Sequence, residues 1–433
     1  MSKEIYRFEH GFLAVEEDGF SNTHFRLLEK YLEKQKKSYL FETSYRKGKK
    51  GIKFCQYVGV ITVKDLTIYV LPKADKDAKE ETESEKKSKN EQLWQDRLTF
   101  MLLQVYKLKV QTTSPANLQW KPNVLLNIFL KKFLDEVAVL LNQGLIKTYR
   151  KTDGNRTALK GKLLFNKQIA VNCVHQERFY VRYTTYDYNH ILNRIIRQAL
   201  LAICDITNSS DIKGRATSTL FNFPELDEIA VTPELFSRLI FDRKSEDYRN
   251  VIKLAEMILL NYSPDLHHGS NHVWTLMFDM NKLWEEFVYV TLKRKLAGCT
   301  VMAQKQKPLW ESNSNRKTVR ADIVVEKEGQ IFVLDTKWKM PRYDGKIVPS
   351  DADLHQMYVY LDVYKNEGIK AKKVALLYPG KEEDVYGHFK EDNASCDMIF
   401  LPGKDYSAEK SEKKEFISWQ DKMVDKIKEW IGH

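Results

Sequence analysis

The pattern of apolar and polar positions in the last third of the chain predicts a defined order of helices and strands. Apolar residues recur at helical spacing in Asp279–Leu296 and Asp351–Asn366, whereas short apolar runs at Thr300–Ala303 and Val374–Tyr378 are typical of strands. Between them, Val319–Lys339 predicts a hairpin, because the β-branched run Ile323–Val325 and the apolar run Ile331–Leu334 flank the polar, glycine-containing turn EKEGQ. The predicted order is therefore helix, three strands, helix and strand.

Charged side chains stand at the ends of this predicted hairpin. We expect Asp322 to open its first strand and Asp335 to close its second, with Lys337 on the same face as Asp335 because it follows two residues later. Carboxylate oxygens are the ligands that Mg²⁺ prefers, and water activated by such a metal can attack a phosphodiester. This D-x(n)-(D/E)-x-K arrangement indicates a metal-dependent nuclease core. The alternative is a surface hairpin with an ion pair across its open end.

The two predicted helices add further candidates. Glu285 on the first helix is a third acid for the metal, and Gln356 and Tyr360 share one face of the second helix because they are four residues apart. Trp284, Trp338 and Tyr360 are interpreted as core residues rather than as platforms for base stacking.

Residues 1–74 are predicted to form a β-rich N-terminal domain. The strands are expected at Gly11–Val15, Tyr39–Glu42, Ile52–Val63 and Leu66–Leu71, around a helix at Thr23–Lys36. A basic loop, Tyr45–Lys50, lies between two of these strands. It is either a solvated hairpin tip or a contact for phosphate or an acidic partner, with Arg46 and Lys47 as the candidate partner-binding residues.

The middle of the chain divides into a charged segment and a longer helical region. Residues 75–91 are almost entirely charged or small and predict a linker or mobile loop. Residues 92–265 are predicted to be mainly helical, and residues 266–433 to form the nuclease domain. The expected helices of the middle region are Leu93–Leu108, Val124–Asn142, Asn189–Cys204 and Tyr248–Leu260, with strands at Leu159–Leu164 and Phe179–Tyr183.

Histidines and cysteines offer little further chemistry. His190 is interpreted as a helix cap or core residue, and the loop with His267, His268 and His272 lacks an acid at the spacing of a metal site. The five cysteines are scattered without a CxxC pair, which argues against a disulfide framework or zinc site and fits a reducing compartment.

Composition fits a folded protein with a polyanionic partner. The 433 residues are 43% hydrophobic, and 70 Lys and Arg against 59 Asp and Glu give a net charge of +11. The sequence has no apolar run long enough for a membrane span and no signal-like start, so we expect a cytoplasmic protein. It also has no GxxxxGK[ST] or GxGxxG motif, so we do not expect it to hydrolyse nucleotides itself.

Several separate stretches resemble one family. Phe278–Val288 (FDMNKLWEEFV) is similar to the "FDMN-x-LFE-x-FV" signature of McrC proteins, the nuclease subunits of McrBC-type modification-dependent restriction systems. Four shorter segments, in the same order as in the family, are similar to its "i-x-LPK", "gL-x-x-x-Y", "LRG" and "lNr" motifs: Tyr69–Lys73, Gly144–Tyr149, Leu159–Gly161 and Leu192–Arg194. The resemblance covers residues 55–380.

This resemblance implies a fold, an activity and a partner. The fold is an α+β multidomain protein whose C-terminal part is a PD-(D/E)xK, restriction-endonuclease-like αβββαβ core, and the activity is Mg²⁺-dependent cleavage of DNA. The partner is an McrB-like AAA+ GTPase hexamer that binds GTP, recognises double-stranded DNA bearing modified cytosine, and is stimulated by the McrC subunit. The resemblance implies that the subunit docks on this hexamer through its N-terminal part, here residues 1–74.

The resemblance also implies roles for individual residues. Asp322 and Asp335 are metal ligands, Lys337 positions water, Glu285 is the helix acid and Gln356 an accessory polar residue. Thr336, which stands between the second acid and the lysine, is expected to contribute only its backbone carbonyl. Ala321 replaces the family's usual proline.

Two other functions remain open. A stand-alone PD-(D/E)xK nuclease of DNA repair would need no GTPase. A non-catalytic adaptor would activate a GTPase while its nuclease pocket is vestigial, which the intact Asp322, Asp335 and Lys337 argue against.

Overall fold

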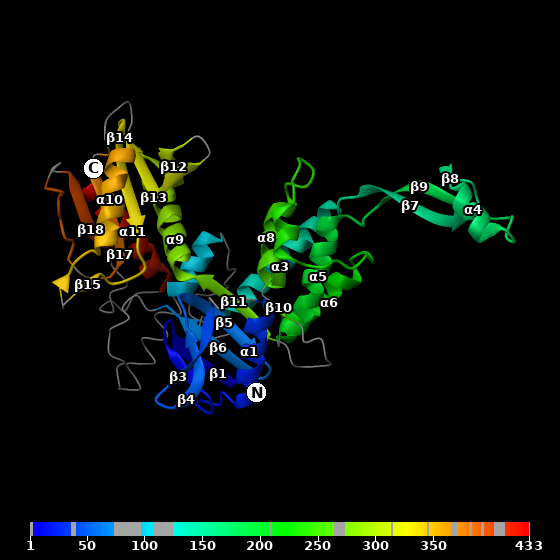
Figure 1. Ribbon diagram of the computed structural model, residues 1–433, viewed down its shortest axis with the longest axis horizontal. Coiled ribbons are helices and arrows are strands. Elements are labelled where there is room, and N and C mark those ends of the chain that lie inside the picture. The colour runs from blue at the N-terminus through cyan, green and yellow to red at the C-terminus, as the bar shows by residue number, and fades with distance from the viewer. Residues whose placement is uncertain are drawn as a thin grey trace. The chain divides into compact units, whose positions relative to one another are not determined.

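A computed structural model of the chain describes residues 3–35, 40–72, 97–106, 124–207, 209–260, 262–263, 273–312, 315–343, 346–364, 371, 373–380, 383–390, 394–401 and 412–432. The chain divides into two compact units (Figure 1). The first combines Met1–Pro122 with Met277–His433, and the second is Asn123–Leu276. The predicted linker at residues 75–91 and the three histidines at 267, 268 and 272 lie outside the described residues.

The N-terminal part of the first unit contains two groups of strands and a helix. β1 (Lys3–Phe8) runs parallel to β6 (Leu66–Leu71), and β5 (Tyr57–Val63) pairs antiparallel with β6. A three-stranded sheet has the order β2-β4-β3, and α1 lies between β2 and β3 in the chain. These elements span Phe12–Ala14 (β2), Asn22–Gln35 (α1), Phe41–Arg46 (β3) and Lys49–Phe54 (β4).

The single strand predicted at Ile52–Val63 is wrong, because it consists of parts of two strands. The chain leaves the small sheet at Phe54 and enters the other sheet at Tyr57. Apolar residues on both sides of this break hide it in the sequence pattern. The sequence reasoning also missed β1, whereas the predicted strand Leu66–Leu71 is confirmed as β6.

The C-terminal part of the first unit is built on a five-stranded sheet of order β12-β13-β14-β17-β18. The first three strands are antiparallel neighbours, and β17 and β18 continue the sheet in parallel with β14. In chain order the elements are α9 (Met280–Lys295), β12 (Thr300–Glu311), β13 (Arg316–Lys327), β14 (Gln330–Thr336), β15 (Arg342–Tyr343), β16 (Lys346–Ile347), α10 (Asp351–Val363), β17 (Lys373–Pro379), β18 (Ser395–Leu401) and α11 (Glu412–Trp430). The predicted order of helix, three strands, helix and strand is therefore present, with the small hairpin β15–β16 inserted before α10.

Helices cover both faces of this sheet. Val333 of β14 packs in a buried cluster with Met357 and Tyr360 of α10, whereas the neighbouring Phe332 meets Trp430 of α11 edge to face. Successive residues of a strand point to opposite faces, so α10 and α11 lie on opposite sides of the sheet. By the same alternation Asp335 and Lys337 point to the α10 face.

The boundaries of the central hairpin differ from those predicted. β13 begins at Arg316, so Asp322 lies inside the strand instead of opening it. The turn is only Glu328–Gly329, shorter than the predicted EKEGQ, and both of these residues have positive φ angles of 51° and 76°. β12 continues to Glu311, well beyond the predicted Ala303, and α10 ends at Val363 rather than Asn366.

The second unit contains helices and a three-stranded sheet of order β7-β9-β8. Figure 1 shows β7 and β9 as a long hairpin that carries β8 and α4 at its far end. Its elements are α3 (Val124–Gln143), β7 (Thr148–Arg156), β8 (Lys162–Leu163), α4 (Phe165–Asn172), β9 (Phe179–Asp187), α5 (Ile191–Ile206), α6 (Ser210–Phe221), α7 (Pro233–Ser237), α8 (Tyr248–Leu260) and β10 (Tyr262–Ser263), and β11 (Val273–Asp279) leads into the first unit. The predicted helix Tyr248–Leu260 is confirmed, whereas the strand expected over Leu159–Leu164 is reduced to β8.

Two of the family-like motifs have structural roles. The buried Asn193 amide donates to the carbonyls of Ile146 and Tyr188, and its oxygen accepts from the Tyr248 hydroxyl. Gly161 has a φ angle of 83°, and a Cβ there would lie 2.3 Å from the Arg182 carbonyl oxygen, so only glycine fits. Both motifs therefore hold the second unit together.

Within the described residues, no helix is both long enough and apolar enough to span a lipid bilayer.

Candidate active site

The two predicted acids face each other across neighbouring strands. Ile323 pairs with Leu334, so the next position in the antiparallel register sets Asp322 opposite Asp335. Asp322 Oδ2 accepts hydrogen bonds from both the backbone N–H and the hydroxyl of Thr336, each at 2.9 Å. Thr336 therefore fixes the orientation of the Asp322 carboxylate, which goes beyond the carbonyl contribution predicted for it.

Asp335 and Lys337 form a buried ion pair. Asp335 is 1% exposed, and its Oδ2 lies 2.6 Å from Lys337 Nζ. Gln356 of α10 connects the two, because its amide nitrogen donates to Asp335 Oδ1 (3.1 Å) and its oxygen accepts from Lys337 (2.9 Å). The Tyr360 hydroxyl lies 2.7 Å from the same amide nitrogen. The structure thus brings Asp322, Asp335, Lys337 and Gln356 together, as the residue pattern predicted.

Glu285 of α9 lies close enough to this group for its charge to interact with those of Asp322 and Asp335. Gln304 donates its side-chain amide to Glu285, and it has a left-handed backbone (φ 53°) at a break in the β12–β13 pairing between Ala303 and Lys305. Such a conformation is uncommon for a residue other than glycine. Sequence reasoning missed Gln304, because no local pattern marks a left-handed residue inside a strand.

The carboxyl groups of the site repel one another. Burial, together with the charge of Asp322, raises the pKa of Asp335 to about 6 even though Lys337 opposes the shift. Burial and the same Asp322 charge raise the pKa of Glu285 to about 7, and the Gln304 hydrogen bond opposes this. Burial alone would lower the pKa of Lys337, but the carboxylates of Asp335 and Asp353 outweigh it and hold that pKa above its usual value. The lysine is therefore protonated at neutral pH.

Asp353 is a further acid that sequence reasoning missed. It lies in the first turn of α10, where it accepts from Lys339 (2.6 Å) and Ser350 (2.7 Å), and it stands 3.5 Å from Lys337 Nζ. The Ser350 hydroxyl in turn caps the helix by accepting from the Asp353 N–H. The sequence signal was available, because Ser-x-x-Asp before an apolar helix is a capping box.

The donor set fits a hard divalent cation. Its candidate ligands are carboxylate oxygens and a backbone carbonyl. The negative charges of the carboxylates repel one another, and a bound cation would reduce this repulsion. No three His, Cys, Asp or Glu side chains are grouped as a ready-made metal cage in the part of the chain that the structure describes. Mg²⁺, the cation predicted from the sequence, is commonly held by one or two carboxylates and keeps several waters.

The other candidates lie apart from this cluster. Arg46 and Lys47 are exposed at the turn between β3 and β4, and Lys47 has a φ angle of 51°. Trp284 and Trp338 are buried as predicted, with their rings 5.4 Å apart, and the Trp338 indole N–H donates to Glu9 at 2.7 Å. His190 is the N-cap of α5, which confirms its predicted role.

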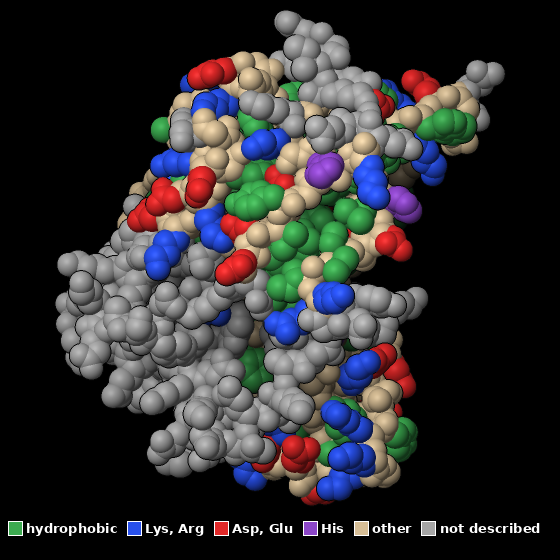
Figure 2. Space-filling model, turned by 90° about the vertical axis from the view of Figure 1, so that its left-hand side faces the viewer, with side chains coloured by type: hydrophobic (Ala, Val, Ile, Leu, Met, Phe, Trp, Pro, Cys, Tyr) green, Lys and Arg blue, Asp and Glu red, His purple; other side chains and the backbone are tan. Residues whose placement is uncertain are grey.

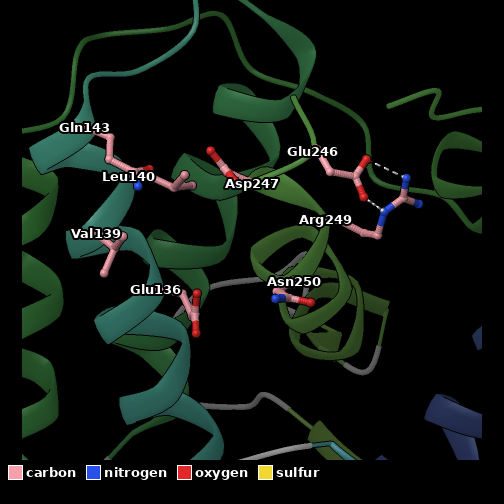
Figure 3. Close-up of a pocket in the computed structure, with 8 residues that line it drawn as sticks. All are labelled: Glu136, Val139, Leu140, Gln143, Glu246, Asp247, Arg249 and Asn250. Atoms are coloured by element: carbon pink, nitrogen blue, oxygen red, sulfur yellow. Dashed lines mark hydrogen bonds and ion pairs between the residues drawn. The ribbon is translucent and has the colours of Figure 1, made fainter. Parts of the chain in front are cut away.

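A cavity in the second unit carries none of these candidates. Figure 3 shows it beside α3 and α8, with a volume of about 360 Å³. Arg249 and Glu246 form an ion pair at its rim, with a 2.7 Å contact. The lining residues are Glu136, Val139, Leu140, Gln143, Glu246, Asp247, Arg249 and Asn250. The candidate active site is therefore the carboxylate–lysine cluster of the first unit.

Fold and site together define a mixed α+β protein with a carboxylate–lysine cluster where a sheet meets helix α10. The model of the family described as "McrBC 5-methylcytosine restriction system component" matches residues 52–379. This is most of the chain, so the protein belongs to that family. The resemblance to McrC proteins drawn from the sequence motifs is confirmed.

Relatives among curated proteins and solved structures agree with this membership. The "Type IV methyl-directed restriction enzyme EcoKMcrBC" of Escherichia coli (strain K12) is 22% identical over 296 residues, which cover 65% of this chain and 84% of that protein. A chain in the "half-complex from tetradecameric assembly of Thermococcus gammatolerans McrB AAA+ hexamers with bound McrC" has a TM-score of 0.60 at 20% identity, covering 98% of this chain and 100% of its own. This likeness establishes a shared fold. A chain of the Thermococcus gammatolerans McrBC complex is also similar, with a TM-score of 0.45 at 22% identity over 68% of this chain and 88% of its own.

Proposed function

We propose that this protein is the Mg²⁺-dependent DNA endonuclease subunit of a GTP-dependent, methylation-dependent restriction complex, with a PD-(D/E)xK active site. The observation that carries the proposal is the cluster of Asp322, Asp335, Lys337 and Gln356, which lies on two strands and one helix in the order expected of such a core. Family membership supports the restriction context.

The side chains have distinct proposed roles. Asp322, Asp335 and the Thr336 carbonyl hold Mg²⁺, and Glu285 is an additional acid near them. Bound Mg²⁺ would supply Lewis-acid stabilisation of the phosphate charge. Lys337 is protonated and orients the attacking water while it balances the charge that develops on the phosphate.

Gln356 and Asp353 are proposed to keep Lys337 in place. Both oxygens of Asp335 have partners, so a cation that binds this carboxylate competes with Lys337 for it. Gln356 at 2.9 Å and Asp353 at 3.5 Å are alternative partners that hold the ammonium group close to the site.

The proposed partner is an McrB-like AAA+ GTPase hexamer that binds GTP and selects double-stranded DNA bearing modified cytosine. The structural relative from Thermococcus gammatolerans is described as McrB AAA+ hexamers with bound McrC, and it shares the fold of this chain. The absence of a phosphate-binding motif in this sequence agrees with GTP being bound by the partner.

The test compares wild type with Asp335→Asn, each with and without an McrB-like AAA+ GTPase from the same host, on modified DNA with Mg²⁺ and GTP. We expect Asp335→Asn to cleave at least about 100-fold more slowly, because it removes an electrostatic element of the site, while stimulation of GTP hydrolysis is retained. Asp351→Asn is the matched control, because this aspartate is exposed on the same helix as Gln356.

The other outcomes separate the alternatives. Cleavage by the wild-type chain without the GTPase would favour a stand-alone nuclease. No cleavage in any mixture, with stimulation of GTP hydrolysis intact, would favour a non-catalytic adaptor. Loss of both activities in Asp335→Asn would count against a separate catalytic role for this residue.

A further inference from the structure

The strands β12 and β13 continue beyond the sheet as a two-stranded ribbon. β13 pairs with β14 only from Ile323 onward, whereas its residues 316–321 pair with β12 alone. The ribbon therefore consists of residues 305–311 and 316–321, and we refer to it as the β12–β13 ribbon. Asp322 is the next residue of the same strand, so the ribbon leads directly into the candidate active site (Figure 1).

The β12–β13 ribbon is strongly basic. Glu311 is the only acidic residue of residues 305–320. The basic residues are Lys305, Lys307, Arg316, Lys317 and Arg320, and none of these five forms an ion pair with another described residue. Figure 2 shows lysine and arginine side chains interspersed with acidic ones over the face that it draws. A run of basic side chains beside buried acids is suited to a polyanion, although the charge of Arg320 also acts on one of these acids, Glu285.

Two large apolar side chains are exposed near the tip of this ribbon. Leu309 is 52% exposed and Trp310 is 55% exposed. The strand pairing is irregular between Pro308 and Trp310, and it sets Trp310 opposite Lys317. An exposed indole beside a lysine offers one contact to an apolar sugar or base and another to a phosphate.

Helix α10 fixes the base of the ribbon to the catalytic cluster. The Tyr364 hydroxyl accepts from the Ala321 N–H (2.7 Å) and donates to the Lys305 carbonyl, which links both ribbon strands. The Tyr360 hydroxyl donates to the Arg320 carbonyl (2.7 Å). Tyr360 also contacts Gln356, so the ribbon and the cluster are held by the same helix.

We propose that the β12–β13 ribbon lies in a groove of the duplex DNA substrate, with Arg316 and Lys317 on phosphates and Trp310 at the groove surface. The inference rests on the proposed nuclease function and identifies how the scissile strand is presented to Asp322 and Asp335. At about 3.3 Å per residue, seven strand residues extend for roughly 20 Å. A two-stranded ribbon of this length can cross the major groove, which is about 12 Å wide.

The test measures binding of a short fluorescent duplex to the full-length chain in EDTA, over a series of salt concentrations. We expect Arg316→Ala/Lys317→Ala to weaken binding about 10-fold or more. It should also lower the slope of log affinity against log salt by about 2, since each phosphate contact contributes about 0.9. Trp310→Ala should weaken binding without a change in slope, and Trp310→Phe should restore part of it. Lys390→Ala/Lys428→Ala is the matched control of two surface lysines elsewhere in the first unit.

Cleavage with the GTPase partner is measured in parallel, so that the inference and the proposed function can fail separately. Suppose that the wild type cleaves DNA, and that Arg316→Ala/Lys317→Ala binds and cleaves DNA as well as the control variant does. This result would overturn the assignment of the ribbon to DNA binding and leave the nuclease proposal standing. A wild-type chain that binds no duplex would overturn the assignment as well. If Arg316→Ala/Lys317→Ala binds DNA as the wild type does but no longer stimulates GTP hydrolysis, the ribbon contacts the partner protein rather than DNA. Ribbon-dependent binding without any wild-type cleavage would count against the nuclease proposal.

Discussion

At the scale of single residues, two polar side chains organise the acids without belonging to the acid–lysine motif. Thr336 donates twice to Asp322, and Gln304 donates to Glu285. The motif itself was predictable, because Asp335 and Lys337 are two residues apart on one strand and need only the strand period to meet. Thr336 to Asp322 and Gln304 to Glu285 are contacts between different elements, so the local pattern contains no sign of them.

The burial of Glu285, together with the charge of Asp322, makes removal of the Glu285 charge stabilising when no metal is present. The pKa of Glu285 in the folded protein is about 7, above the ordinary 4.5. Ionisation of Glu285 therefore lowers the free energy of unfolding. This loss of stability is absent below about pH 4.5, where the group is protonated in both states, and complete above about pH 7, where it is ionised in both. Glu285→Gln removes the charge and keeps an acceptor for Gln304. We expect it to raise the free energy of unfolding by about 1–2 kcal/mol at about pH 8, a value reduced for partial exposure, and to have little effect at about pH 4.5.

Urea unfolding in EDTA at the two pH values measures this difference. Glu286→Gln is the matched control, because Glu286 is the exposed neighbour on the same helix. An equal change in the free energy of unfolding at both pH values would show that the pKa of Glu285 is not raised in the folded protein. Addition of Mg²⁺ should stabilise wild type more than Glu285→Gln if the proposed role of Glu285 as an acid near the metal holds, since the variant has one carboxylate fewer there.

At the scale of elements, the sequence pattern predicted a helix or strand correctly where that element has a buried face. α8, α9 and β6 match their predicted ranges within two residues, because each buries one face or both and its apolar residues therefore follow the period of the element. The outer part of β13 is largely exposed and polar, and no residue of β7 (TYRKTDGNR) is buried, so no apolar alternation marks them as strands. The side chains of the ribbon are mostly exposed and polar. For this reason the sequence pattern did not predict the ribbon, and for the same reason the ribbon is available for binding.

The link between α10 and the ribbon can be tested by removing one oxygen atom. Tyr364→Phe leaves the Ala321 N–H and the Lys305 carbonyl without the hydroxyl that joins them. A buried polar group without a partner costs about 1–3 kcal/mol, so we expect a loss of stability in that range and faster hydrogen exchange at the Ala321 amide. Tyr358→Phe is the control on the same helix, because Tyr358 is 41% exposed. Unchanged exchange at Ala321 would contradict the bridging role.

At the scale of the whole molecule, the first unit joins the two ends of the chain. Glu9 accepts from Trp338, and the Met280 N–H donates to the Gln56 carbonyl at the start of α9. Periodicity describes neighbours in sequence, so it could predict strands near the N-terminus and a core near the C-terminus but not that they pack as one compact unit. The candidate catalytic cluster and the β3–β4 hairpin, with Arg46 and Lys47 at its turn, therefore belong to the same unit.

That hairpin is the place to test how the chain meets its proposed GTPase. Arg46 and Lys47 are exposed at the turn, away from the acids, so their loss should weaken docking while the active site is preserved. Lys47 has a left-handed backbone (φ 51°), and asparagine tolerates this conformation better than alanine, so Arg46→Ala/Lys47→Asn removes charge with little strain. We expect the concentration of the chain that half-maximally stimulates GTP hydrolysis to rise about 10-fold, which corresponds to about 1.4 kcal/mol.

Lys64→Asn is the matched control, because Lys64 is also a lysine with a left-handed backbone (φ 54°) in a hairpin turn of the same region. Cleavage at a saturating concentration of the GTPase should remain at the wild-type level in Arg46→Ala/Lys47→Asn, since a docking defect is overcome by mass action whereas a catalytic defect is not. Half-maximal stimulation at the control concentration would mean that this basic turn is only a solvated hairpin tip, and that the GTPase docks on another surface of the chain.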